Sequence, residues 1–155
     1  MKAVLITGPN ELEIVDDWPE PECGPDEVVI KIRAVGLCGT DLSAIGNAQV
    51  GREPSVAGHE GGGEIVKVGA NVTDRFVGQR VVIEPNFPCM DCEYCNAGRS
   101  SLCQNMSWPS LLSEYSVAPA RFTWVVPDNV PDVALGCIEP LVVGYTAVKR
   151  SGIQA

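Results

Sequence analysis

Four of the seven cysteines lie close together in the chain with the spacing Cys-x2-Cys-x2-Cys-x7-Cys, at Cys89, Cys92, Cys95 and Cys103. Four thiolates at this spacing can surround one tetrahedral zinc ion, with Zn–S distances of about 2.3 Å, and they leave no coordination position open. The pattern therefore predicts a structural zinc site. An iron–sulfur cluster is the alternative, since its Cys-x2-Cys-x2-Cys-x3-Cys run differs mainly in a shorter last gap.

The segment around these cysteines, residues 84–112, is polar and has few apolar side chains with which to build a core of its own. Bound metal would supply the folding free energy that such a segment lacks. We call this segment the cysteine lobe, and we expect it to fold around its zinc ion.

A second group of potential ligands is spread more widely along the chain. Cys38 follows a predicted strand, and His59, the one histidine of the chain, is followed directly by Glu60. Thiolate, imidazole and carboxylate groups together can form a zinc site that keeps its fourth position open for water or substrate. Glu60 and Glu139 are both candidates for the carboxylate ligand, and the residues alone leave the choice between them open.

Two further residues bear on this second site. Asp41 can accept the other ring N–H of His59, which would fix the tautomer of the imidazole and make it a more basic ligand. Asp41 can equally cap a short helix, and both roles can hold at once. Cys137, two residues before Glu139, is a rival ligand, but a small buried hydrophobe is the favoured interpretation of this cysteine.

Composition limits the class of protein. The 155 residues suffice for one domain with a sizeable core. The formal net charge of −9 gives no electrostatic attraction to nucleic acid or to an anionic membrane, so neither is an expected partner. The N-terminus lacks the features of a signal peptide. We therefore expect a cytoplasmic protein, whose reduced cysteines bind metal rather than form disulfides.

Short strands dominate the predicted secondary structure. Apolar alternation and turn residues predict strands over residues 1–7, 11–16, 27–35, 63–69, 79–84, 114–118 and 122–126. A helical turn is expected over 40–45. Helices are expected within 132–152, divided at Glu139-Pro140 because the residue before a proline disfavours helix. This order predicts a mainly β fold with C-terminal helices, built as a compact barrel or sandwich.

The motifs together resemble the zinc-dependent alcohol and polyol dehydrogenases of the medium-chain dehydrogenase/reductase superfamily. The family's zinc signature, G-H-E-x2-G-x5-G-x2-V, is present in full from Gly58 to Val72, and the G-x-C-G-T-D block matches at 36–41. The cysteine lobe lies where the family has it. The resemblance implies a GroES-like catalytic domain over residues 1–155, a partly open β-barrel. Glu-Pro-Leu at 139–141 is similar to the sorbitol and threonine dehydrogenase branch.

The resemblance also implies roles for single residues. Cys38 and His59 match the ligands of a catalytic zinc, and Glu60 matches a carboxylate that binds this metal directly in some members. Glu139 matches the position of the third ligand, and the four lobe cysteines match the ligands of a structural zinc. Thr40 matches the hydroxyl that hydrogen-bonds the substrate oxygen and starts the proton relay, beside Asp41 in the same block. Two zinc ions per chain, NAD(P) and a small alcohol or polyol substrate are thus implied.

This chain departs from its relatives at two positions of the block. Ser43 stands where many relatives have a histidine that passes the proton to solvent, so the relay must use another group or water. Gly39 stands where alcohol dehydrogenases have a basic residue that can contact the cofactor phosphate.

The sequence contains no G-x-G-x-x-G fingerprint of a dinucleotide-binding Rossmann domain; its glycine run at 61–63 belongs to the zinc signature. We therefore expect a catalytic domain that lacks its cofactor domain and is inactive alone. Oligomer contacts of a homo-oligomer are expected in the missing part. The alternative is a stand-alone zinc-binding interaction module, which predicts that no large apolar face is left exposed.

Overall fold

The computed structural model describes residues 1–47 and 54–153, and the remaining positions of the expected domain lie outside the described residues. The strands are β1 (Ala3–Gly8), β2 (Glu11–Val15), β3 (Glu27–Gly36), β4 (Ser55–Val56), β5 (Glu60–Val68), β6 (Arg80–Ile83), β7 (Tyr115–Pro119) and β8 (Thr123–Val125). The helices are α1 (Gly39–Gly46), α2 (Glu93–Asn96), α3 (Asp132–Leu135) and α4 (Ile138–Ser151), with the 3₁₀ turns η1 (Ser100–Leu102) and η2 (Ala120–Phe122).

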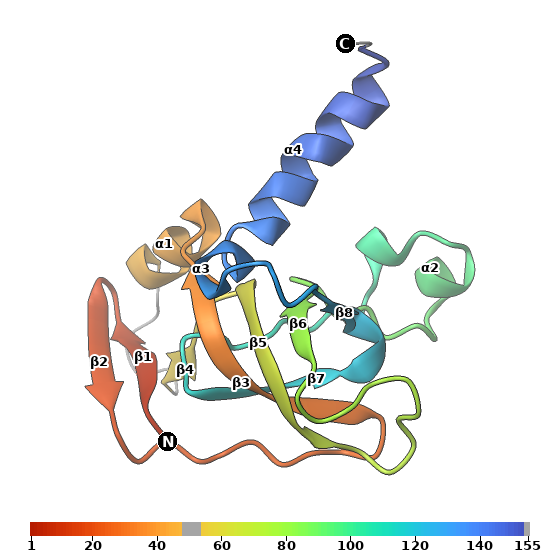
Figure 1. The fold of residues 1–155 in the computed structure, drawn as a ribbon. Coiled ribbons are helices and arrows are strands. Elements are labelled where there is room, and N and C mark those ends of the chain that lie inside the picture. The colour runs from red at the N-terminus through yellow and green to blue at the C-terminus, as the bar shows by residue number, and fades with distance from the viewer. Residues whose placement is uncertain (48–53, 154–155) are drawn as a thin grey trace.

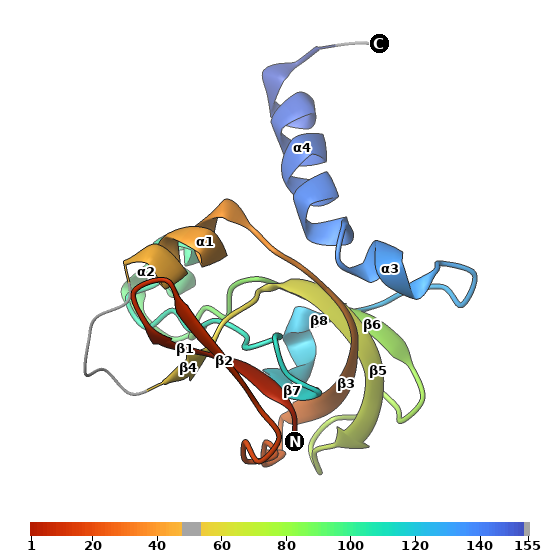
Figure 2. The same ribbon diagram turned by 90° about the vertical axis from the view of Figure 1, so that its left-hand side faces the viewer.

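The strands form two sheets. One has the order β2-β1-β4 and the other β7-β3-β5-β6-β8, and all pairings among the described residues are antiparallel. The larger sheet is strongly curved, and the smaller one lies beside it without closing a barrel (Figures 1 and 2). The prediction of a mainly β, partly open barrel with C-terminal helices is confirmed.

The register of β3 against β5 determines where the candidate ligands meet. Gly36, the last residue of β3, pairs with Glu60, the first residue of β5. Because the strands are antiparallel, the residues just after β3 and just before β5 emerge at the same end of the sheet. Cys38 and His59 are these residues. Strand β5 starts at Glu60 rather than at Gly63 as expected, because its glycines also pair with β3.

Glycine is required where β3, β5 and β6 approach one another most closely. A Cβ added at Gly62 would collide with the carbonyl oxygen of Val81 in β6, and one at Gly63 with that of Lys31 in β3. The absence of a side chain at 61–63 therefore allows the tight curvature that brings the ends of these strands together.

The hydrophobic core fills the concave side of the larger sheet. Val28, Ile30, Ile65 and Val81 are fully buried and come from its three central strands. Phe87, at the base of the cysteine lobe, is also buried and stacks on Phe122, with the ring centroids 5.5 Å apart. The lobe is thus attached to the barrel through this aromatic pair.

The C-terminal helices divide at a different place from the one expected. The break lies at Gly136 and Cys137, and Glu139-Pro140 is inside α4. The predicted division at Glu139-Pro140 is wrong because Pro140 occupies the first turn of α4, where a backbone N–H has no partner within the helix and is not needed. Arg80 ties β6 to the start of α3, since its Nη2 donates to Asp132 Oδ1 at 2.7 Å.

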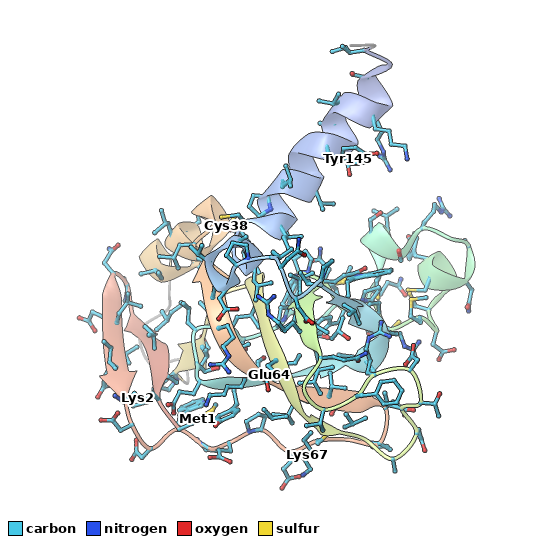
Figure 3. The ribbon with its side chains drawn as sticks, in the orientation of Figure 1. Met1, Lys2, Cys38, Glu64, Lys67 and Tyr145 are labelled. Atoms are coloured by element: carbon cyan, nitrogen blue, oxygen red, sulfur yellow. The ribbon has the colours of Figure 1, made fainter. Side chains whose placement is uncertain are left out.

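Helix α4 projects away from the barrel and carries Tyr145 outward (Figures 1 and 3). None of its described residues is buried. Apolar side chains along it are more than half exposed, namely Leu141, Val142, Val143, Tyr145 and Val148. Neither α4 nor any other helix in the described ranges combines the length and the apolar character needed to cross a membrane.

Candidate metal centres

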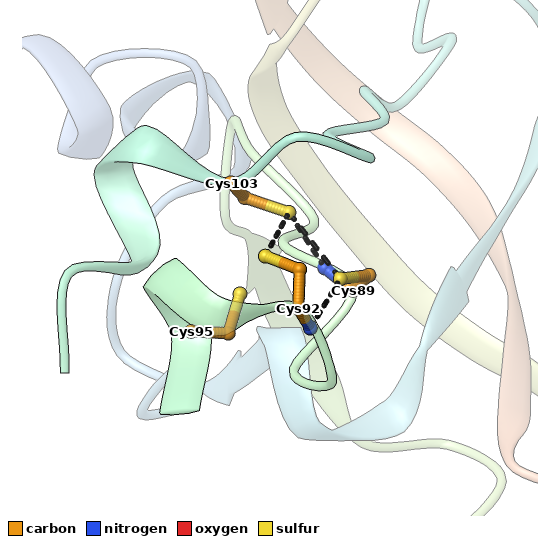
Figure 4. A group of neighbouring side chains, drawn as sticks. All are labelled: Cys89, Cys92, Cys95 and Cys103. Atoms are coloured by element: carbon orange, nitrogen blue, oxygen red, sulfur yellow. Dashed lines mark hydrogen bonds between the residues drawn. The ribbon is translucent and has the colours of Figure 1, made fainter. Parts of the chain in front are cut away.

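The four cysteines of the lobe converge on one point (Figure 4). Their Sγ atoms all lie within 4.8 Å of one another. Cys103 Sγ lies 3.5 Å from Cys89 Sγ and 4.0 Å from Cys92 Sγ. A tetrahedron of thiolates around zinc, with Zn–S at about 2.3 Å, has edges of about 3.8 Å. The spacing and chemistry of the donors therefore fit one zinc ion.

The backbone of the lobe prepares these sulfurs to bind a cation. Cys89 N–H donates to Cys103 Sγ at 3.2 Å, and Cys92 N–H donates to Cys89 Sγ at 3.4 Å. Backbone N–H groups of Cys95 and Gln104 lower the pKa of the Cys92 thiol to about 6. Loss of hydration on partial burial raises the pKa of the Cys95 thiol to about 12. The Cys92 thiol therefore loses its proton more readily than the Cys95 thiol.

The second group forms at the end of β3 and β5. Cys38 is the N-cap residue of α1, and His59 and Glu60 enter β5. One donor atom from each of Cys38, His59 and Glu60 lies within 4.8 Å of the other two. One sulfur, one nitrogen and one carboxylate oxygen at this spacing fit a zinc ion with one coordination position left open.

Asp41 connects the two segments that carry these donors. It is buried, with 4% of its surface exposed. Its Oδ2 accepts the Cys38 N–H at 2.9 Å, and its Oδ1 accepts the Gly58 N–H at 3.2 Å and lies 3.2 Å from His59 Nδ1. The contact to Nδ1 leaves Nε2 of the imidazole for a metal. Asp41 thus occupies the place expected of it, both at the start of a helix and beside the histidine.

A cavity of about 500 Å³ opens over this group. Besides the three donors, its walls include Thr40, Pro85, Asn86, Trp108, Glu139, Pro140 and Val143. Thr40 Oγ1 lies 3.7 Å from Cys38 Sγ, so its hydroxyl is close to one of the metal donors. The site therefore combines metal donors, a hydroxyl group and space for a small molecule.

Glu139 reaches the same cavity from α4, although it is not part of the compact donor group. Burial and the neighbouring Glu60 carboxylate raise its pKa above the usual value, and the nearby His59 partly offsets this. Of the two carboxylates that the sequence left open, Glu60 is thus the one grouped with Cys38 and His59, and Glu139 is its neighbour in the cavity wall.

Other residues are placed differently from expectation, or were not foreseen. Cys137 is exposed rather than buried, and it lies in neither donor group nor the cavity wall. Gly39 has no atom near the position that a Cβ would take, and Ser43 is exposed. Asn86 and Trp108 were missed as wall residues, because no motif of the sequence includes either of them.

Comparison with known proteins agrees with this architecture. Residues 24–128 match the family model for the alcohol dehydrogenase GroES-like domain. A sorbitol dehydrogenase from Bombyx mori is 37% identical over 97% of this chain and 46% of its own length. Galactitol-1-phosphate dehydrogenase from Escherichia coli superposes with a TM-score of 0.87 and 30% identity, over 96% of this chain and 44% of that one.

A third similar protein is a zinc-binding dehydrogenase from Sinorhizobium meliloti whose structure was solved with bound NADP. It superposes with a TM-score of 0.87 and 31% identity, over 99% of this chain and 46% of that chain. The chain spans about half the length of the curated relatives it matches. With its zinc signature, partly open barrel and two donor groups, the chain belongs to the alcohol dehydrogenase GroES-like domain family, in the sorbitol and threonine dehydrogenase-like branch of the medium-chain dehydrogenases/reductases.

Proposed function

We propose that this chain is the zinc-binding catalytic domain of an NAD(P)-dependent alcohol or polyol dehydrogenase, which oxidises a secondary alcohol. The observation that carries the proposal is the donor group of Cys38, His59 and Glu60 at the base of a cavity of about 500 Å³. Zinc held there would act as a Lewis acid that lowers the pKa of the substrate hydroxyl. The domain comprises residues 1–155, and the cysteine lobe holds a second, structural zinc.

The other residues of the cavity have distinct tasks in this proposal. Thr40 hydrogen-bonds the substrate oxygen and takes part in moving its proton away from the cavity, a role worth about 10²–10⁴-fold in rate for general acid–base groups. Asp41 holds Cys38 and His59 in place and fixes the imidazole tautomer. Glu139 stands beside Glu60 as the alternative carboxylate ligand.

The nicotinamide cofactor would be bound by residues outside this chain. The relatives are about twice as long, and the S. meliloti protein holds NADP. The exposed apolar side chains along α4 disfavour the alternative of a stand-alone zinc-binding module, which predicts no such face. We place the protein in the cytoplasm, where its seven free cysteines would stay reduced. We also expect the complete protein to be a homo-oligomer, as the family resemblance implies.

Metal analysis tests the two sites separately. The purified protein is expected to hold two zinc ions, as measured by mass spectrometry of the metals. The Cys38→Ser variant should lose one ion and stay folded, whereas Cys92→Ser should lose the other and lower the melting temperature. Retention of two zinc ions by both variants would show that the ligand assignments are wrong, and iron in place of zinc would favour a cluster in the lobe.

An activity assay tests the reaction. The 155-residue chain, supplied with NAD⁺ and a panel of polyols, is expected to form no NADH. The complete protein should reduce NAD(P)⁺ with at least one of these polyols, and Cys38→Ser should abolish that activity. A complete protein that oxidises none of them while holding both zinc ions would refute the proposed reaction.

A further inference from the structure

Asn86 and Trp108 lie opposite each other on the two chain segments that join the cysteine lobe to the barrel. Next to them, Phe87 and Ser107 form an antiparallel bridge with backbone hydrogen bonds of 2.8 and 3.1 Å. Successive side chains of an extended segment point to opposite sides. Since Phe87 is buried in the core, Asn86 and Trp108 lie on the side away from the core, where both line the cavity over the metal donors.

The indole determines how the amide of Asn86 is turned. Trp108 Nε1 lies 3.0 Å from Asn86 Oδ1. An indole N–H can only donate a hydrogen bond, so it must meet the amide oxygen, because the opposite orientation of the amide would bring two donors together. The NH₂ group is therefore directed away from the indole. Within the described part of the chain, this NH₂ group has no hydrogen-bond partner of its own.

This NH₂ group differs in kind from the other polar side chains of the cavity wall. Glu60 and Glu139 offer carboxylate oxygens, and Thr40 offers a hydroxyl beside a metal donor. Among the described wall residues, Asn86 alone carries an amide, and none is Lys or Arg. A phosphate or carboxylate is usually bound with the help of such a cation. This part of the wall therefore suits an uncharged oxygen that accepts a hydrogen bond.

We propose that Asn86 is a specificity-determining residue of this cavity: its NH₂ group donates a hydrogen bond to a second, uncharged oxygen of a ligand whose first oxygen binds at the metal donors. The ligand class is an alcohol with a further hydroxyl, ether or carbonyl oxygen. Trp108 is a positioning residue, because it acts through the amide that it orients. The inference rests on the proposed function, since it requires a ligand at the group of Cys38, His59 and Glu60.

Paired metal-binding probes test the inference without catalysis. The protein is loaded with Co²⁺ and titrated with thiols, and binding is read from the thiolate-to-cobalt absorption band. Each ω-methoxyalkanethiol is compared with the alkanethiol that has CH₂ in place of the ether oxygen, at several chain lengths. The ether oxygen can accept a hydrogen bond but cannot donate one. A signal that Cys38→Ser abolishes belongs to the donor group under the cavity.

The ratio of the two affinities isolates the hydrogen bond. Asn86→Asp keeps an oxygen for the indole N–H and places an acceptor where the NH₂ group was. At the chain length that reaches this position, the variant should lower the preference for the ether probe by about 2–12-fold, as expected for one neutral hydrogen bond. The matching ω-hydroxyalkanethiol should keep its preference, because a hydroxyl can donate to the new carboxylate. Asn86→Leu should lower the preference for both probes.

Two further variants serve as controls. Asn129→Asp makes the same change of charge at an exposed asparagine outside the cavity wall, and its ratios should match those of the original protein. Trp108→Phe keeps an aromatic ring but removes the N–H that orients the amide. Its ether preference should lie between those of the original protein and Asn86→Leu, and an unchanged preference would show that the indole does not position the amide.

The outcomes are distinct. Loss of the ether preference in Asn86→Asp, with the hydroxyl preference retained, supports the inference. Equal ratios for Asn86→Asp and the original protein at every chain length, with Cys38-dependent binding intact, would overturn it and leave the proposed function standing. Equal loss for the ether and hydroxyl probes in Asn86→Asp would also overturn it, because that pattern indicates a changed cavity shape. Absence of any Cys38-dependent signal would overturn the metal site and the inference with it.

Discussion

Asp41 is the residue whose replacement tests the candidate catalytic centre most directly. Its two oxygens receive two backbone N–H groups, from Cys38 and Gly58, and one of them also contacts His59 Nδ1. An asparagine has the same shape but only one oxygen. Whichever way its amide turns in Asp41→Asn, an NH₂ group must face at least one N–H donor, and at least one hydrogen bond to a charged acceptor is lost.

The structure sets the size of the expected effect. A hydrogen bond to a charged group contributes about 1.5–3 kcal/mol, and a buried donor left without a partner costs about 1–3 kcal/mol. Loss of such a contact behind a metal ligand typically weakens metal binding by about 10–100-fold. We therefore expect Asp41→Asn to bind zinc at the Cys38–His59 site about 10–100-fold more weakly, with the lobe site unchanged.

Competition with a chromophoric chelator measures both sites in one titration. Asp16→Asn is the matched control, because it makes the same change of charge at a side chain that is 80% exposed. It should bind zinc as the original protein does. If Asp41→Asn also retained the original affinity at both sites, Asp41 would not orient the ligands, and the reasoning from its hydrogen bonds would be wrong. Equal weakening of both sites would point to general unfolding instead.

Two further predictions concern the thiols and the glycines. In zinc-stripped protein that keeps its native circular dichroism spectrum at pH 7, iodoacetamide should modify Cys92 well before Cys95, since their pKa values are about 6 and about 12; peptide mass mapping measures the order, and equal rates would contradict it. Gly36→Ala should lower the free energy of unfolding by about 1–3 kcal/mol, because its Cβ would lie 2.5 Å from the Gly136 carbonyl oxygen. Gly39→Ala, whose Cβ would meet no atom within 4 Å, should unfold in urea like the original, and equal loss in both variants would refute the steric cause.

Most strands were predictable because their signal is local. Residues 27–35 alternate apolar and charged side chains, and the observed strand β3 extends this range by one residue. The two-residue strand β4 was not predicted, since it forms only through pairing with Leu5 and Ile6 of β1. The break between the two C-terminal helices was misplaced because the local sequence does not show where the second helix starts. A proline breaks a helix only inside it, and the local sequence did not show that Pro140 lies in the first turn.

Site residues that lie close together in the chain could be predicted from the sequence. The four lobe cysteines lie so close in the chain that their convergence follows from the spacing alone, and Asp41 lies one helical turn from Cys38. Trp108 and Asn86 could not be found this way, because their sequence neighbours carry no metal ligand pattern that includes them. Their place in the cavity wall depends on the Phe87–Ser107 pairing at the base of the lobe.

The sequence by itself determined which potential metal donors this protein has, and which of them lie close together in the chain. The tertiary structure decided which donors meet. Cys38 and His59 are 21 positions apart, and they come together because antiparallel pairing joins Gly36 to Glu60 across β3 and β5. The same register places Glu60 with them, whereas Glu139, which lies on the separate helix α4, is outside this compact group. Hydrogen-bond register between distant strands is a property of the assembled sheet, so no local pattern in the chain could have made that choice.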